Sequence, residues 1–258
     1  MITVEKQNNV VTNDDRLNYL NSLSSFQELY VEWLVAESTL YFVFVNNIKV
    51  GYLYITHSKI IVEFFLADEY ISSKEDVFKT VLAVLKPKKA YVKTFDFVFM
   101  ACCNMYQKKS KPIGLLFRRI SEEKYFTLEK GIHIRIADDN DLLFLKSQKS
   151  GLYENEDELI RLITNKNIIM YFLGEDLIGC GFLIRVNEMF DYYDIGMWVN
   201  PGYRNKGYAK QIIGNLKEKC IQEKKIPICG CAIENVGSRK TLEANGMKTI
   251  HQLVEYKF

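Results

Sequence analysis

The chain has 258 residues, of which 48% are hydrophobic and 26% are charged, and its formal net charge is +2. This length allows one large domain or two ordinary ones, and the composition is typical of a globular protein. The small net charge argues against binding to nucleic acid or to an anionic membrane surface, and short basic runs such as 86–89 are expected in solvated loops.

The N-terminus lacks a cationic segment followed by an apolar core, so no signal peptide is expected. The most apolar runs, 41–55 and 95–106, are interrupted by Asn, Lys or Asp, and no membrane helix is expected. The six cysteines contain no C-x-x-C pair and lie far from the three histidines in sequence, which argues against a zinc site and against a disulfide framework. We expect buried, reduced thiols in a cytoplasmic protein. The many Asn, Lys and Ile residues are typical of bacteria with AT-rich genomes.

The first half of the chain is predicted to alternate helices and strands. Helices are expected where apolar residues recur with helical spacing, and strands where apolar and β-branched residues are continuous or alternate. Asn46 and Asn47 form the expected turn of a hairpin. The predicted helices are 14–35 (in one or two pieces), 75–85 and 97–108, and the predicted strands are 41–45, 49–56, 60–66, 90–95 and 115–120.

The second half begins after a polar segment, 121–131, which we interpret as a linker. Asp138 and Asp139 are expected to cap its first helix, which continues through Leu145. Its other predicted helices are 156–164, 209–223 and 237–245, and its predicted strands are 132–137, 168–173, 177–186, 192–199, 227–232 and 249–258.

The two halves share one order of elements, which indicates an internal repeat. Where the second half has a basic loop after a strand, the first half has the segment 66–76, which contains four acidic residues and no glycine. Such a segment would repel phosphate, so the first half is not expected to bind the same ligand. An unrelated α/β domain over residues 1–130 is the alternative.

The segment 192–216 predicts a site for a phosphate group. It reads as a buried strand, a stop at Asn200-Pro201-Gly202, a basic loop, and an amphipathic helix from about Ala209. The first amides of a helix have no intrahelical partner and lie at the positive end of its dipole. Gly207 allows a ligand to approach the backbone closely, and Arg204 and Lys206 add positive charge.

This loop, Arg204-x-x-Gly207-x-Ala209, resembles the signature of the GNAT acyltransferase superfamily. A second family signature is matched by Asn235 at the start of a helix that ends at Gly246-Met247. The resemblance implies an α/β (α+β) fold with a mixed, mostly antiparallel central sheet flanked by helices. It also implies tandem copies, with a degenerate N-terminal domain at 1–120, the linker at 121–131, and a GNAT domain binding acetyl-CoA at 132–258.

The resemblance also assigns roles in binding acetyl-CoA. In the family the strand before the loop splays from the next strand, and the pantetheine arm lies in the gap. Contacts with this arm are implied for residues of the strand, contacts with the pyrophosphate for the loop, and contacts with the CoA arm for the following helix. The residues concerned are Met197, Trp198 and Val199 on the strand, Arg204, Asn205, Lys206, Gly207, Tyr208 and Ala209 in the loop, and Asn235 and Ser238 on the helix.

For catalysis, the family commonly uses a carboxylate on the strand before the loop as the base, and Asp194 is the best-placed candidate here. A structural role for Asp194, as a hydrogen-bonded strand residue or as a residue at a solvated edge, is an equal alternative. Leu242 stands where many family members carry a tyrosine that acts as general acid. Ser238, Tyr208 or solvent is left to protonate the leaving thiolate, and no metal is required.

Two functions remain open at this point. The first is an acyl-CoA-dependent N-acyltransferase, which moves an acetyl group to a primary amine by direct attack. The second is a catalytically silent acyl-CoA-binding or regulatory module, which the replacement at Leu242 favours. In either case the expected partners are acetyl-CoA and an unidentified amine acceptor, and the chain is expected to be a monomer or a homodimer.

Overall fold

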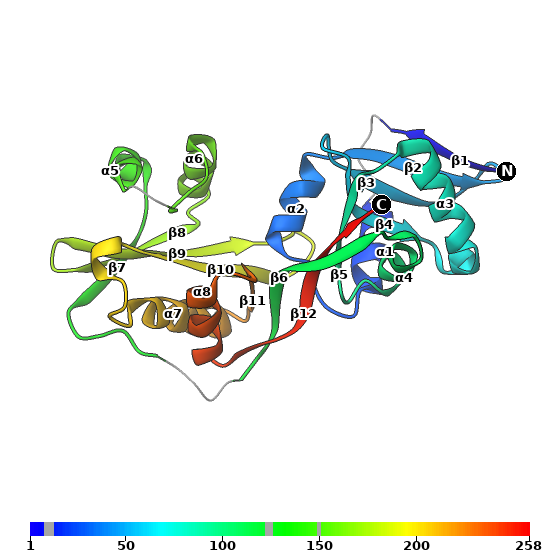
Figure 1. The fold of residues 1–258 in the computed structure, drawn as a ribbon. Helices are drawn as coiled ribbons and strands as arrows, with labels where there is room; N and C mark the ends of the chain where they lie inside the picture. Colours follow the sequence, from blue (N-terminus) through cyan, green and yellow to red (C-terminus); the bar gives the residue numbers. More distant parts are fainter. Residues whose placement is uncertain (8–12, 122–125, 149–150) are drawn as a thin grey trace. The chain divides into compact units, whose positions relative to one another are not determined.

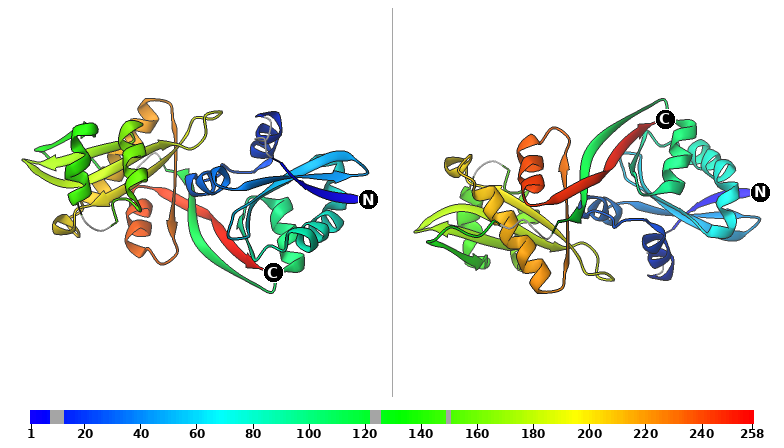
Figure 2. Two further views of the ribbon diagram at one scale, coloured as in Figure 1. Left: turned by 90° about the horizontal axis from the view of Figure 1, so that it is seen from above. Right: turned by 90° about the horizontal axis from the view of Figure 1, so that it is seen from below.

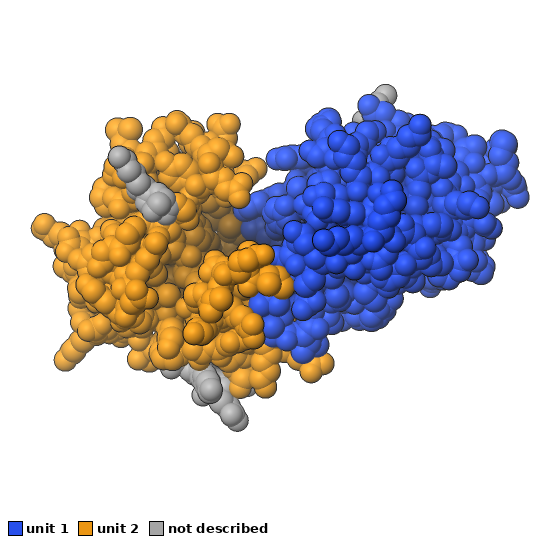
Figure 3. Space-filling view, viewed as in Figure 1, with its two compact units in different colours: residues 1–116, 249–258 blue, residues 117–248 orange. Residues whose placement is uncertain are grey.

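The computed structural model describes residues 1–7, 13–121, 126–148 and 151–258. The chain divides into two compact units, one of residues 1–116 and 249–258 and the other of residues 117–248 (Figure 3). Each unit is a layer of strands covered by helices on both faces (Figure 1). The predicted fold class, a mixed and mostly antiparallel sheet flanked by helices in two copies, is confirmed.

Unit 1 contains a sheet with the strand order β1-β2-β3-β4-β5-β12-β6. The turn between β2 and β3 is the predicted one, because Asn46 and Asn47 have positive φ angles of 49° and 67°. The elements are β1 (Ile2–Lys6), α1 (Asn13–Ser22), α2 (Leu29–Ala36), β2 (Thr39–Val45), β3 (Ile48–Ile55), β4 (Ile60–Leu66), the 3₁₀ helix η1 (Asp68–Ser73), α3 (Lys74–Leu85), β5 (Lys89–Lys93), α4 (Phe97–Tyr106) and β6 (Lys109–Ile120).

The core of unit 1 lies between its sheet and the helices α3 and α4. Phe64 on β4, Phe78 on α3 and Phe99 on α4 are buried together, with ring centroids 5.2–6.1 Å apart. The opposite face of the sheet carries Tyr52 and Glu63 and is covered by α1 and α2. Strand β1, which lies at the edge of the sheet and pairs with β2, was not predicted.

Unit 2 contains the strand order β6-β11-β10-β9-β8-β7. Helices α5 and α6 pack on one face of this sheet through a core that includes Leu145, Leu159 and Trp198. Helices α7 and α8 cover the other face (Figure 1). The elements are β7 (Ile132–Ile136), η2 (Asp139–Asp141), α5 (Leu142–Ser147), α6 (Glu156–Thr164), β8 (Ile168–Leu173), β9 (Asp176–Arg185), β10 (Tyr192–Val199), η3 (Pro201–Tyr203), α7 (Tyr208–Gln222), β11 (Ile226–Ala232) and α8 (Val236–Ala244). Strand β12 (Met247–Lys257) starts at the end of unit 2 and lies almost wholly in unit 1.

The compact units and the predicted domains differ at the C-terminus. The last strand was assigned to the second domain, but residues 249–258 belong to unit 1. The reason is the pairing of β12, which runs antiparallel to β5 from Leu253 opposite Lys93 to Lys257 opposite Lys89. Strand β12 also lies beside β6 (Figure 2). The predicted linker, 121–131, lies partly outside the described residues.

Two further expectations can be compared with the fold. All six cysteines are free thiols, and five of them are buried. Among the described residues, no helix is both long enough and apolar enough to span a membrane.

Candidate functional site: a cavity at the end of strand β10

Strand β10 keeps one hydrogen-bonded neighbour along its length and loses the other midway. Its antiparallel pairing with β9 runs from Tyr193 to Val199. Its parallel pairing with β11, as described, ends at Asp194 opposite Ile228. Strands β10 and β11 therefore splay apart beyond Asp194. They are the two strands for which the family resemblance implied a gap.

Backbone groups of β10 face the gap that this splay opens. The N–H of Asn200, directly after the strand, donates to the carbonyl of Ile178 beside it at 3.0 Å. Successive backbone groups alternate between the two sides of a strand. The backbone groups of Met197 and Val199 therefore point away from β9 and towards the gap.

The loop after β10 is anchored by its own side chains. Arg204 Nε donates to the carbonyl of Val199 at 3.2 Å, so this carbonyl already has a partner. Tyr203 donates its hydroxyl to Asp176 at 2.6 Å, and Lys206 Nζ lies 4.8 Å from the centroid of the Tyr203 ring. These contacts hold two cationic side chains at the entrance to α7.

The start of α7 presents a row of uncommitted amides. Gly207 is the N-cap residue and has a φ angle of 90°, a left-handed conformation that glycine adopts without strain. The first backbone hydrogen bond of the helix is donated by the N–H of Lys210 to the carbonyl of Gly207, at 3.0 Å. Among the described residues, the amides of 205–209 have no hydrogen-bond acceptor. These donors lie at the positive end of a 15-residue helix, which is a favourable place for an anion.

Asn235 caps α8 on the other side of the gap. Its Oδ1 atom accepts a hydrogen bond from the amide of Ser238 at 3.0 Å, which leaves the two N–H groups of its amide to bind a ligand. Helix α8 ends as predicted, because Gly246 has a φ angle of 74°.

These elements surround one cavity of about 830 Å³. Most of the residues predicted to bind acetyl-CoA line it; the exception is Lys206, which is not among the described lining residues. Five lining residues were not predicted, because neither signature includes them: Tyr203, Lys210, Gly237, Lys240 and Thr241. In the sequence, Lys210 and Lys240 have the pattern of ordinary helix-surface residues, which does not indicate that they line a cavity. The predicted lining residues are Met197, Trp198, Val199, Arg204, Asn205, Gly207, Tyr208, Ala209, Asn235 and Ser238.

The candidate catalytic groups lie at different distances from this cavity. Ser238 and Tyr208 line it, and the side chain of Tyr208 is mostly buried. Asp194 is not among the described lining residues; it lies three residues before Met197, or about 10 Å along an extended strand. Leu242 is only 1% exposed and packs in the interior, so it offers neither a proton nor a surface to the ligand.

Two thiols on β11 lie near these candidates. Burial raises the pKa of Cys229, and the negative charge of Asp194 raises it further. Burial also raises the pKa of Cys231, although a hydrogen bond with Ser238 and the charge of Arg239 act in the opposite direction. Both thiols are therefore protonated at neutral pH, which does not favour a nucleophilic role.

Unit 1 has a much smaller cavity at the corresponding place. It has a volume of about 140 Å³, below the usual range of about 300–1,000 Å³ for ligand pockets. Asp96 caps α4 as Asn235 caps α8, with its carboxylate accepting from the amide of Phe99 at 3.3 Å. Asp68 and the aromatic ring of Phe97 also line this cavity. Its acidic lining and small volume support the expectation that unit 1 does not bind the same ligand.

In the part of the chain that the structure describes, no three His, Cys, Asp or Glu side chains are grouped so that they could hold a metal ion. The groups that line the cavity are backbone amides, cationic side chains and hydroxyl groups, and the carboxylate of Asp194 lies on the same strand as Met197.

Comparison with protein families gives two matches in tandem. Residues 8–120 match the acetyltransferase (GNAT) domain, and residues 135–247 match the acetyltransferase (GNAT) family. The second match includes the whole cavity of unit 2. No curated protein matches the chain.

Solved structures share the fold over the whole chain. An acetyltransferase of the GNAT family from Colwellia psychrerythraea has a TM-score of 0.86 and 19% identity, and the alignment covers 99% of each chain. A tandem GNAT protein from the clavulanic acid biosynthesis pathway has a TM-score of 0.60 and 10% identity, with 100% of this chain and 98% of that chain covered. A GCN5-related N-acetyltransferase from Sphaerobacter thermophilus has a TM-score of 0.64 and 8% identity, with 99% and 95% covered. At these identities the likeness concerns the fold.

Proposed function

Because the chain belongs to the GNAT acetyltransferases and carries two of their domains in tandem, we propose that it moves an acetyl group from acetyl-CoA to a primary amine. The observation that carries this proposal is the row of uncommitted amides at 205–209, which lies in a cavity large enough for a nucleotide-sized ligand. The reaction takes place in unit 2, and unit 1 does not bind a second acetyl-CoA.

The donor is held at three places. The pyrophosphate accepts hydrogen bonds from the amides of 205–209, and Arg204 and Lys206 add their positive charges. The pantetheine arm lies along the open edge of β10, where it bonds to the backbone of Met197 as an additional strand would, and the N–H of Val199 faces the thioester end of the arm. The side-chain amide of Asn235 donates to the same arm from the opposite side of the gap. Trp198 and Ser238 complete the walls.

The transfer itself is a direct attack without a covalent enzyme intermediate. The amine nitrogen attacks the thioester carbonyl, and the developing oxyanion accepts a hydrogen bond from the N–H of Val199. Collapse of the tetrahedral intermediate breaks the carbon–sulfur bond and releases CoA as a thiolate. The amine loses its proton to Asp194 through water, because Asp194 lies too far along the strand for direct contact. The thiolate takes a proton from Ser238, Tyr208 or solvent.

Titration calorimetry with acetyl-CoA tests binding by unit 2. We expect saturable binding, and the absence of heat at millimolar acetyl-CoA would refute the proposal. Turnover is tested separately by following the release of free CoA thiol in the presence of a panel of primary amines.

A silent acyl-CoA-binding module is the second candidate function, since the buried Leu242 replaces a proton donor. The two candidates differ in the thiol-release assay. Steady turnover with any amine eliminates the silent module, whereas tight binding of acetyl-CoA without turnover over the whole panel favours it.

A further inference from the structure

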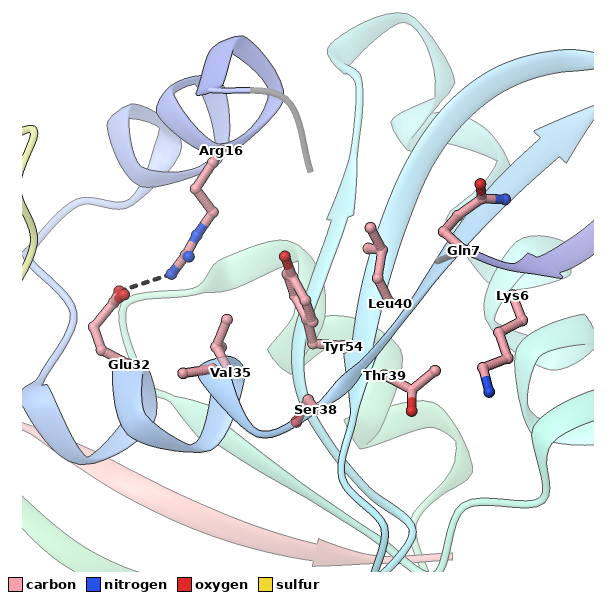
Figure 4. A pocket seen from close by; sticks show the side chains of 10 residues that line it. Lys6, Gln7, Arg16, Glu32, Val35, Ser38, Thr39, Leu40 and Tyr54 are labelled. Atoms are coloured by element: carbon pink, nitrogen blue, oxygen red, sulfur yellow. Dashed lines mark hydrogen bonds and ion pairs between the residues drawn. The ribbon is translucent and has the colours of Figure 1, made fainter. Parts of the chain in front are cut away.

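Unit 1 has a second, larger cavity on the sheet face that is covered by α1 and α2. Its volume is about 550 Å³, within the usual range of small-molecule sites. It lies away from the small cavity at the end of β4, with which it shares no described lining residue. Figure 4 shows its lining side chains, which come from β1, α1, α2, β2 and β3.

One end of this cavity is lined by Arg16 and Glu32, and the buried carboxylate of Glu63 lies behind them. Arg16 contacts Glu32 through Nη2 at 2.7 Å and Glu63 through Nε at 3.1 Å. The buried Lys93–Asp96 pair adjoins these three residues, and the formal charges of all five groups sum to −1. Burial lowers the pKa of Arg16, but the two carboxylates outweigh this effect and raise it, so Arg16 stays charged.

This group is held in place by further buried side chains. Tyr52 donates its hydroxyl to Glu63 at 2.8 Å, and Gln27 donates to Glu32 at 2.6 Å. Gln27 in turn accepts from Lys93 Nζ at 2.5 Å. Buried ion pairs of this kind add little to stability compared with apolar packing. They do fix the charged groups in advance, which reduces the entropy that a ligand loses on binding.

The other end of the cavity has the opposite charge. Lys6, at the end of β1, is exposed and has no ion-pair partner among the described residues. Figure 4 shows Lys6 on one side of the pocket and the Arg16–Glu32 pair on the other, with Tyr54 and Leu40 between them. Val35, Leu40 and Tyr54 are buried side chains that line the cavity between its two ends, so part of the wall there is apolar.

A ligand that matches this cavity carries a cation at one end, an anion at the other and an apolar body between them. We propose that the cavity of unit 1 binds a zwitterionic, amino-acid-type metabolite, with its ammonium group at Glu32 and its carboxylate at Lys6. A simple amine would leave Lys6 without a counter-charge, and a simple carboxylate would face the excess negative charge at Arg16, Glu32 and Glu63. The site is separate from the acetyl-CoA cavity and does not depend on the function proposed for it.

Titration calorimetry on the full chain tests this proposal with a series of ω-amino acids from glycine to 8-aminooctanoate. Each member is compared with the amine and the carboxylate of equal length. We expect one length to bind best, because the two ends of the cavity have a fixed separation. We expect both matched single-charge compounds to bind at least about tenfold more weakly, which corresponds to one lost charge-assisted contact.

Two variants locate the binding site. Lys6→Gln should weaken the best ω-amino acid about tenfold and leave the matched amine unchanged, and Glu32→Gln should weaken both the amino acid and the amine. Lys79→Gln, which removes a positive charge from an exposed position on α3, is the matched control and should change neither. Because Lys6 is exposed, its replacement is not expected to disturb folding even if Glu32→Gln does.

Three outcomes would overturn the proposal: no binding of any member at about 10 mM, equal binding of the single-charge compounds, or unchanged binding by Lys6→Gln. Gly207→Asp separates the two proposals, since it alters only the cavity of unit 2 and should leave amino-acid binding intact. Loss of amino-acid binding in Gly207→Asp would place the amino acid in unit 2 and would also refute the site in unit 1. A failure to bind acetyl-CoA would count against the proposed function alone.

Discussion

The pair of variants Gly207→Asp and Gly207→Asn isolates the charge at the proposed pyrophosphate site. A side chain at Gly207 would meet no atom within 4 Å, so both replacements have room. Both must adopt the positive φ angle of 90°, and Asp and Asn are among the residues that tolerate it best. The two variants therefore carry a similar backbone cost and differ mainly by one negative charge.

The size of the effect follows from the distance to the bound phosphate. A carboxylate about 6 Å from a phosphate charge is disfavoured by about 3 kcal/mol at an effective dielectric constant of about 20. Position 207 is exposed, so solvent and salt should reduce this to about 1–2 kcal/mol. We expect Gly207→Asp to bind acetyl-CoA about 5- to 30-fold more weakly than Gly207→Asn.

Titration calorimetry of both variants at low salt measures this difference, and a repeat at about 0.5 M salt should reduce it. Thermal unfolding of both proteins provides the control for stability. Equal affinities of the two variants at low salt would refute the placement of the pyrophosphate at the start of α7, even if acetyl-CoA binds elsewhere on the chain.

Three further predictions concern single residues. Asn235→Ala should lose the cap of α8 and about 1 kcal/mol of stability. Asn235→Asp should keep the cap but bind acetyl-CoA more weakly than the wild type. Equal binding of acetyl-CoA by Asn235→Asp and the wild type in calorimetry would contradict a role for the side-chain amide. Asp194→Asn should retain acetyl-CoA affinity, lower kcat by about 10²- to 10⁴-fold and abolish the acidic limb of the pH–rate profile; an unchanged profile would assign Asp194 a structural role. Arg135 holds the pKa of Asp141 below its usual value, chiefly through their hydrogen bonds, so this carboxylate stabilises the folded state above about pH 4 and the contribution is lost as the pH falls through the lowered pKa. Thermal unfolding should therefore show Asp141→Asn to be less stable than wild type at neutral pH, with a gap that narrows as the pH falls below about 4. A gap independent of pH would contradict the assignment.

Much of the unit 2 site could be predicted because it depends on neighbours in sequence. The stop at Asn200-Pro201-Gly202, the left-handed Gly207 and the cap at Asn235 each act within a few residues of chain. Local chemistry of this kind is visible in a single sequence. The helix-surface lysines Lys210 and Lys240 could not be assigned to the cavity, because the helical pattern alone does not show which polar positions face a ligand.

The fold of unit 1 was harder to predict from the sequence, because more of it depends on residues that lie far apart in the chain. Strand β1 is short and partly exposed, so the order of its apolar and polar residues does not distinguish a strand from a loop. Its pairing with β2 depends on residues about 40 positions away in the sequence. Helices α1 and α2 were predicted as apolar segments, but their buried polar side chains bind groups much later in the chain. Lys93 reaches the hydroxyl of Tyr19 at 2.6 Å across 74 residues.

The sequence by itself determined the class of fold, the two copies, and the strand, loop and helix at 192–216 that carry the proposed pyrophosphate site. Only the tertiary structure decided where the last strand lies, how far β10 and β11 separate, and which charges meet in unit 1. The physical reason is the range of the interactions: turns, caps and hydrophobic periodicity act locally, whereas strand pairing and buried ion pairs need partners that the folded chain alone brings together. The contact between Lys89 and Glu255, 166 residues apart, is one such partnership.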